Sequence, residues 1–229
     1  MIVVLFDIDG TLITTKGAGQ AAMHRVARKT AGSEPSDRRL RFAGRTDRSI
    51  INDHFDAYGI EWTPENFSNF CDTFVQRLPT QLAESEGQVL PGITDALTRL
   101  QAADHVHLGL LTGNMRKAAR IKLDHFGLTE HFLHAGEIVG GFGDLHPDRD
   151  DVARDALGEM QTTLGTDIDP TRVWVIGDTP HDVRCARAIG ASVLAVATGG
   201  YSLDELHATE PDLAVENMLV AHRWWEEVL

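Results

Sequence analysis

Four aspartates and one threonine follow short hydrophobic runs of this sequence, at points where a strand would end. They are Asp7, Asp9, Thr112, Asp178 and Asp182. Ligands bind beyond the carboxyl ends of the strands in a parallel α/β sheet, so these side chains are expected to meet at one rim. Four carboxylates that close cannot all ionise without a compensating cation, and an oxygen-only ligand set favours Mg²⁺. The pattern therefore predicts a magnesium site.

The spacing of Asp7 and Asp9 indicates what such a site could do. On a continuing strand, side chains two residues apart point the same way and can reach one phosphorus atom. A carboxylate is a competent nucleophile for phosphoryl transfer, giving an acyl phosphate, and a second carboxyl can protonate the leaving alkoxide. The Thr112 hydroxyl and the backbone amides of Gly113 and Asn114 would hold phosphate oxygens at the start of the next helix. These residues predict phosphoryl transfer through a covalent intermediate.

Alternating strand and helix patterns must position these residues. Short β-branched runs predict strands, and the stretches between them predict helices. The predicted strands are residues 2–6, 106–111, 173–176 and 193–196, and the predicted helices lie near 115–126, 148–163 and 181–189. This order predicts the α/β class, with a doubly wound parallel sheet, a Rossmann-like core, covered by helices on both faces.

A helical block interrupts this pattern directly after the first strand. Thr63 and Pro64 suit the N-cap and first position of a helix, and aromatic and leucine residues then recur every three or four positions. The block predicts an inserted α-helical cap domain at residues 15–88. Residues 1–14 and 89–229 would form the α/β catalytic core.

The composition is that of a globular protein with an acidic surface. The 229 residues are 42% hydrophobic and 24% charged, and the formal charge is 21 − 34 = −13, which argues against nucleic acid as a partner. No apolar run approaches the roughly 20 residues of a membrane helix, and the N-terminus does not resemble a signal peptide. With only Cys71 and Cys185, a cytoplasmic protein without a disulfide framework is expected, as a monomer or a homodimer.

The three polar clusters resemble motifs of a known family. A DxDGT run occupies residues 7–11, Thr112-Gly113 follows the second predicted strand, and GDxxxD occupies residues 177–182. In this order they resemble three of the four signature motifs of the haloacid dehalogenase superfamily, and the helical insertion is similar to the cap of its phosphoglycolate phosphatase-like members. The resemblance covers essentially the whole chain.

The resemblance implies a role for each acidic residue. Asp7 would be the nucleophile, and Asp9 the general acid and base. Mg²⁺ would be held by the Asp7 carboxylate, the Asp9 backbone carbonyl and Asp178, with Asp182 supporting from nearby. The activity implied is that of a Mg²⁺-dependent phosphatase, which hydrolyses a small phosphorylated metabolite through an aspartyl phosphate on Asp7.

The fourth motif of the family is where this sequence departs. Members usually supply a lysine shortly before the third acidic cluster, whereas the last lysine here is Lys122. Arg149 opens a predicted helix at a suitable distance, and its guanidinium could pair with a phosphate oxygen and with Asp7. His146 is the second candidate, although a partly protonated imidazole is a poorer fixed cation. Arg149 is therefore the predicted catalytic cation, with a surface position for its side chain as the alternative.

The predicted cap carries an unusual charge. Residues 16–48 hold nine lysines and arginines against three acidic residues, a balance of +6, so the remainder of the chain sums to −13 − 6 = −19. In similar phosphatases a loop such as the one at residues 44–47 lies over the active site and contacts the leaving group. Arg45 is the candidate for recognising an anionic substrate, and a solvated basic side chain is the alternative.

Other functions of the same core remain alternatives. A phosphosugar mutase shares these residues and differs in keeping water away from the phosphoenzyme. Haloacid dehalogenation is disfavoured by Asp9, because a halide leaving group needs no acid, and phosphonate cleavage would require a desolvated cap lysine. A non-catalytic binding protein would be expected to have lost Asp7, Asp9 or Asp178, and all three are present.

Overall fold

A six-stranded parallel sheet organises the chain in the computed structural model, which describes residues 1–35 and 40–229. The strand order is β10-β9-β8-β1-β4-β7, and every neighbouring pair is parallel. The strands are β1 (Ile2–Phe6), β4 (Val106–Leu111), β7 (Gly140–Gly141), β8 (Val173–Gly177), β9 (Ser192–Val196) and β10 (Leu213–Val215). The predicted fold class is confirmed, and the four predicted strands form the centre of the sheet.

The two strands of this sheet that the sequence did not reveal are its edge strands. β7 consists of two glycines and β10 of three residues. Neither has the run of β-branched residues by which a strand is recognised, because each is held mainly by pairing with a neighbour.

Of the basic residues counted in the segment 16–48, Arg38 and Arg39 lie outside the described residues.

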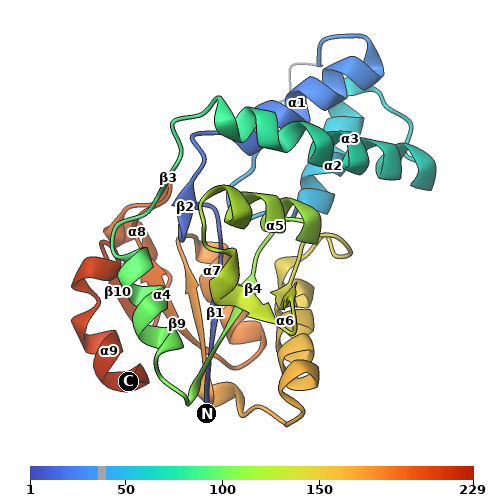
Figure 1. The fold of residues 1–229 in the computed structure, drawn as a ribbon. Helices are drawn as coiled ribbons and strands as arrows, with labels where there is room; N and C mark the ends of the chain where they lie inside the picture. The colour runs from blue at the N-terminus through green and yellow to red at the C-terminus, as the bar shows by residue number, and fades with distance from the viewer. Residues whose placement is uncertain (36–39) are drawn as a thin grey trace.

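Helices cover both faces of the sheet (Figure 1). On one face pack α4 (Ile93–Gln101) and α9 (His222–Val228), and on the other α6 (Arg149–Leu164) and α7 (Pro180–Ala188). The remaining elements of the core are α5 (Arg116–His125), α8 (Leu203–His207), the 3₁₀ turns η1 (Thr129–Phe132), η2 (Pro170–Arg172) and η3 (Met218–Val220), and a small antiparallel pair of β5 (Leu133–His134) with β6 (Glu137–Ile138). The sheet is thus buried on both sides, as a parallel sheet requires.

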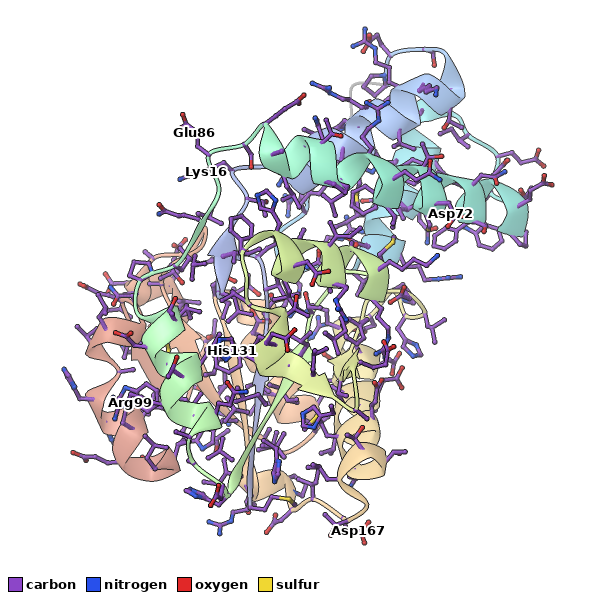
Figure 2. The ribbon with its side chains drawn as sticks, in the orientation of Figure 1. Lys16, Asp72, Glu86, Arg99, His131 and Asp167 are labelled. Carbon is purple, nitrogen blue, oxygen red and sulfur yellow. The ribbon has the colours of Figure 1, made fainter. Side chains whose placement is uncertain are left out.

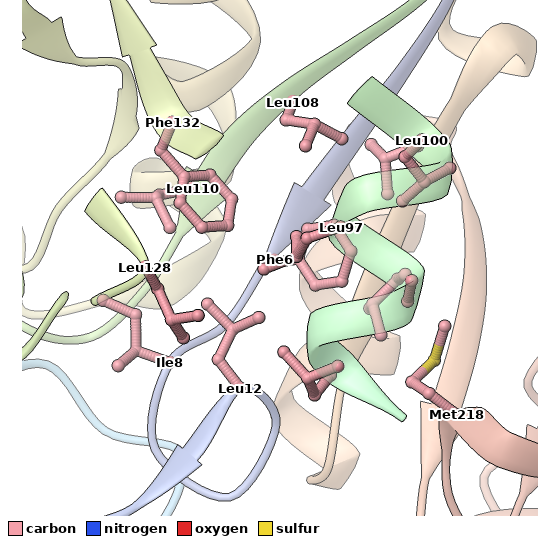
Figure 3. Packing of buried hydrophobic residues seen from close by; sticks show 14 of the residues in the cluster. Phe6, Ile8, Leu12, Leu97, Leu100, Leu108, Leu110, Leu128, Phe132 and Met218 are labelled. Carbon is pink, nitrogen blue, oxygen red and sulfur yellow. The ribbon is translucent and has the colours of Figure 1, made fainter. Parts of the chain in front are cut away.

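The central strand β1 divides its side chains between the two faces. Ile2, Val4 and Phe6 pack toward α4, and Val3 and Leu5 toward α6 and α7. The alternation follows from the two-residue period of a strand. Figure 3 shows the first face, where the ring of Phe6 lies among leucines of α4 and β4. Because β1 is buried on both sides, the segment that follows it emerges at a rigid edge.

Three further helices lie beyond the carboxyl edge of the sheet (Figure 1). They are α1 (Ala18–Ala31), α2 (Asp47–Tyr58) and α3 (Pro64–Ala83), which share one hydrophobic cluster. The N-cap predicted at Thr63 is present, since its hydroxyl accepts a hydrogen bond from the amide of Asn66. Thr46 caps α2 in the same way by accepting from the amide of Ser49. Two short strands, β2 (Ile13–Thr14) and β3 (Gln88–Val89), pair antiparallel where the chain leaves and re-enters the core. Figure 2 labels Lys16 and Glu86 just beyond this pair.

The C-terminal tryptophans belong to helix α9. Trp224 is fully buried and its ring meets Trp174 of β8 edge-on, at 6.2 Å between centroids. Trp225 lies beside it, under the guanidinium of Arg99. The pair therefore anchors α9 to the sheet. Among the described residues, no helix is both long and apolar enough to cross a membrane.

Candidate active site

Three of the predicted acidic residues meet at the carboxyl edge of the sheet. Asp7 follows β1, Asp178 follows β8, and Asp182 lies in the first turn of α7. Each offers a carboxylate oxygen, and these oxygens lie within 4.8 Å of one another. All three side chains are buried. Three of the four carboxylates that were expected to meet therefore lie together in the structure, and that of Asp9 does not join them.

Glycines make this close approach possible. A side chain at Gly10, where φ is +87°, or at Gly199 would overlap the carboxylate of Asp178. A side chain at Gly177 would likewise overlap Asp182. The glycine after the aspartate pair is thus needed both for the left-handed turn and for the space that Asp178 occupies.

Arg149 is the cation that the structure brings to this cluster. It is the first residue of α6 and is only 3% exposed. Its Nη1 donates to Asp7 Oδ2 at 3.2 Å and its Nη2 to Asp182 Oδ1 at 2.5 Å. His146, the second candidate, instead pairs with Asp155 at 2.8 Å. The predicted pairing of the Arg149 guanidinium with Asp7 is therefore present, and the catalytic role of Arg149 remains a prediction.

The charges of the cluster do not balance. Three carboxylates face one guanidinium, which leaves an excess of two negative charges when all three are ionised. Burial raises the pKa of Asp7 to about 6, against the opposing effect of Arg149. Burial, together with the nearby Asp182 and Asp7, raises the pKa of Asp178 well above its usual range. A divalent cation would neutralise the excess negative charge and favour the ionised form of both Asp7 and Asp178. These residues therefore fit a divalent metal ion.

The oxygens of Asp182 are already engaged by protein donors. Oδ1 accepts from Arg149, and Oδ2 accepts from the amide and the hydroxyl of Thr179 at 2.9 and 2.7 Å. In Asp178, by contrast, Oδ1 accepts from the hydroxyl of Thr11 at 3.2 Å, which is its one donor among the described residues. Each oxygen of Asp7 accepts one hydrogen bond, from the amide of Ile8 at 2.7 Å and from Arg149 at 3.2 Å. Asp182 thus accepts more hydrogen bonds than Asp7 or Asp178, and it holds Arg149 beside them.

The carboxylate of Asp9 lies outside this acidic cluster. Its side chain is 41% exposed, and its Oδ2 accepts hydrogen bonds from Asn114 Nδ2 at 2.8 Å and from Lys122 Nζ at 2.5 Å. The two residues of the DxD pair thus have different partners. Asp7 faces Arg149, whereas Asp9 faces Lys122.

Lys122 is the site residue that sequence reasoning missed. It lies on α5, is 4% exposed, and donates to Asn114 Oδ1 at 2.6 Å as well as to Asp9. The signal was available in the sequence, because Lys122 shares the buried face of its helix with Ala118 and Ala119. A lysine on an otherwise apolar helix face needs a partner, and here the partner is Asp9.

The residues predicted to form a phosphate cradle directly follow β4. The Thr112 hydroxyl is buried and accepts from the amide and the side-chain nitrogen of Asn114. A side chain at Gly113 would overlap the carbonyl oxygen of Arg45, which belongs to the segment before α2. Gly113 is therefore required for the close approach of that segment.

Arg45 lies over the site, but its guanidinium is held elsewhere. Nη1 pairs with Asp53 Oδ2 of α2 at 2.5 Å, and Nη2 donates to the carbonyl of Ser49. Arg45 also lines the cavity described next. Its proposed contact with a substrate stays a prediction, and it would require the guanidinium to be shared with Asp53.

A cavity of about 270 Å³ joins the two groups of residues. Asp9, Lys122 and Arg149 line its core side, and Met23, Ile50 and Phe74 line the side formed by α1, α2 and α3. This size is just below the roughly 300–1,000 Å³ of most small-molecule pockets. The cavity therefore suits a small molecule with one end at the carboxylates and the other among apolar side chains.

The start of α2 is docked on the core next to this cavity. The amide of Asp47 donates to Gly113 O at 2.6 Å, and its Oδ2 accepts from the amide of Met115 at 2.8 Å. The Thr46 hydroxyl donates to Pro147 O at 3.2 Å. Burial raises the pKa of Asp47 to about 7. These contacts close the cavity on the side of α2.

Comparisons with known proteins identify related sequences and folds. The sequence profile described as haloacid dehalogenase-like hydrolase matches residues 4–196. A phosphoglycolate phosphatase of Chromobacterium violaceum is 32% identical over 94% of this chain and 92% of its own, and a probable phosphatase of Dickeya dadantii is 24% identical over 93% and 88%. Among solved structures, a putative β-phosphoglucomutase from Thermotoga maritima superposes with a TM-score of 0.64 at 22% identity, covering all of both chains, which shows the shared fold.

Proposed function

The chain belongs to the haloacid dehalogenase-like hydrolases, and from that membership we propose that it is a Mg²⁺-dependent phosphatase acting on a small phosphorylated metabolite through an aspartyl phosphate on Asp7. The observation that carries the proposal is the buried group of Asp7, Asp178 and Arg149, which lines a small cavity. Nucleophile, metal ligand and fixed cation are thus within reach of one phosphoryl group.

The chain's own residues supply the steps of the reaction. Asp7 attacks phosphorus, the bond to the leaving oxygen breaks, and Asp9 gives that oxygen a proton. Water then attacks the aspartyl phosphate, Asp9 takes a proton from it, and phosphate leaves. Arg149 would hold both Asp7 and a phosphate oxygen, since its guanidinium presents several donors in one plane.

We propose that Asp7, Asp178 and the backbone carbonyl of Asp9 hold the Mg²⁺. When bound, the ion would neutralise charge on the phosphoryl group and on the two buried carboxylates. Asp182 supports this arrangement through its pair with Arg149. Thr112 and the amides after it would receive the remaining phosphate oxygens.

Residues 15–88 would act as a cap over this site. The docking of α2 on Gly113 and Pro147 would limit the access of water to the cavity, which would strengthen electrostatic interactions inside it. Arg45 would contact an anionic leaving group. The net charge of −13 and the free cysteines support a cytoplasmic enzyme without a nucleic-acid partner.

Phosphate release from a metabolite panel with Mg²⁺ tests the proposal. The panel includes phosphoglycolate, because several relatives are named phosphoglycolate phosphatases. It also includes sugar phosphates, and their isomerisation without release of phosphate would indicate a mutase instead. Acid quenching with ³²P-labelled substrate should leave label on the wild-type protein and none on Asp7→Asn, with both proteins equally folded by circular dichroism. Failure to hydrolyse even p-nitrophenyl phosphate and acetyl phosphate would overturn the phosphatase assignment.

A further inference from the structure

A network of side chains holds one oxygen of Asp9. Lys122 Nζ and Asn114 Nδ2 both donate to Oδ2, at 2.5 and 2.8 Å. Lys122 also donates to Asn114 Oδ1, and Asn114 Nδ2 donates to the Thr112 hydroxyl. None of the described residues donates to Asp9 Oδ1. The network therefore fixes the direction of the carboxylate and leaves one oxygen available.

The burial of this pair is asymmetric. The side chain of Lys122 is 5% exposed and that of Asp9 is 41% exposed. A buried ammonium is costly unless it is paired, so Lys122 depends on Asp9 and Asn114. Both Asp9 and Lys122 line the cavity that is proposed to hold the substrate. Lys122 is thus buried in the protein, and the carboxylate of Asp9 is accessible from the cavity.

We propose that Lys122 is a positioning residue for the acid and base function of Asp9. This inference rests on the proposed phosphatase function and adds to it a division of labour between two cations. Arg149 holds the nucleophile Asp7, and Lys122 holds Oδ2 of Asp9 so that Oδ1 faces the leaving group. When the bond between phosphorus and the leaving oxygen breaks, its electron pair stays on that oxygen, which takes the proton from Asp9 Oδ1.

The proposal predicts a dependence on the leaving group. An alkoxide is a strong base and must be protonated as it leaves, whereas p-nitrophenolate leaves without a proton. The ratio kcat/KM reports only the steps up to the first irreversible one, so for both substrates it reports transfer of the phosphoryl group to Asp7. Misplacing Asp9 should therefore reduce kcat/KM for an alkyl phosphate far more than for p-nitrophenyl phosphate.

The test compares Lys122→Met with Lys117→Met, an exposed lysine of the same helix. The substrates are p-nitrophenyl phosphate and the best alkyl phosphate of the metabolite panel. We expect Lys122→Met to lose about 100-fold in kcat/KM for the alkyl phosphate and only about threefold for p-nitrophenyl phosphate. Lys117→Met should match the wild type with both. Equal losses on the two substrates would overturn the proposal and leave the phosphatase assignment intact.

A double-mutant cycle with Asp9→Asn tests the coupling directly. If Lys122 acts through Asp9, then Lys122→Met should cost little more once Asp9 is changed, and additive losses would contradict the proposal. Lys122→Arg keeps the charge and should retain part of the leaving-group selectivity, which keeps the test decisive if Lys122→Met folds poorly. A wild-type protein that hydrolyses neither substrate would overturn the phosphatase function and this inference with it.

Discussion

Arg149 Nη1 lies 3.2 Å from Asp7 Oδ2 and joins the first residue of α6 to the end of β1 across 142 positions of sequence. The same guanidinium pairs with Asp182. One buried cation thereby orients the proposed nucleophile and balances part of the charge of the acidic cluster. The sequence lacks a lysine in this region, and the structure puts an arginine beside Asp7.

Replacing Arg149 tests this arrangement. Arg149→Met should lower kcat/KM by roughly 10³-fold, because Asp7 loses its orienting donor and the phosphoryl group loses a fixed positive charge. Arg149→Lys should recover part of the loss, since it keeps the charge without the planar fork. The control is Arg154→Met on the same helix, an exposed residue paired with Asp151. Steady-state kinetics of the three variants checks the prediction, and wild-type activity in Arg149→Met would contradict it.

Metal binding should be visible without any assay of activity. Mg²⁺ at about 100 times its dissociation constant stabilises the folded protein by about 2.7 kcal/mol, which corresponds to a rise in Tm of roughly 5–10 °C for a chain of this size. Asp178→Asn removes a proposed ligand and should abolish most of that rise. Asp167→Asn, an exposed change at the far end of the core (Figure 2), should keep it. Thermal unfolding with and without Mg²⁺ measures both, and an unchanged rise in Asp178→Asn would exclude it as a ligand.

The buried carboxyl of Asp47 should make stability depend on pH. Its pKa is raised by burial from 3.8 to about 7, so between these values the folded protein holds a proton that the unfolded chain has released. The stability contributed by this group is present below pH 4 and is lost as the pH rises through about 7. Asp47→Asn should therefore gain in Tm relative to wild type between pH 5 and pH 8, in saturating Mg²⁺. Asp56→Asn, an exposed change on the same helix, should follow the wild-type profile.

The approach of the cap to Gly113 can be blocked with one methyl group. In Gly113→Ala the added carbon would overlap the carbonyl oxygen of Arg45, so the segment before α2 must shift. We expect kcat/KM to fall by roughly 10²-fold, the cost of a displacement of about 1 Å near a catalytic site. Gly158→Ala is the control, because its added carbon meets no atom within 4 Å and should stabilise α6 slightly. Equal activity of the two variants would show that the docking seen here is not required for turnover.

The sequence by itself determined the elements that carry the chemistry. Short apolar runs of β-branched residues fixed β1, β4, β8 and β9, because burial on both faces leaves a signal in every residue of such a strand. Since parallel strands end at one edge, the residues after them had to meet there. That topological rule is why Asp7, Thr112 and Asp178 could be placed together before any distance was known.

Only the tertiary structure decided which cations serve which carboxylates. From the sequence, Arg149 and His146 were both candidates for the cation beside Asp7. In the packed structure the first turn of α6 directs Arg149 toward Asp7, whereas His146 pairs with Asp155. The rotation of α5 brought Lys122 to Asp9 across 113 positions. Such pairs depend on the packing angles and depths of whole helices, which no local pattern of residues specifies. Local periodicity identifies the buried face of a helix, and only the packed structure shows what that face meets.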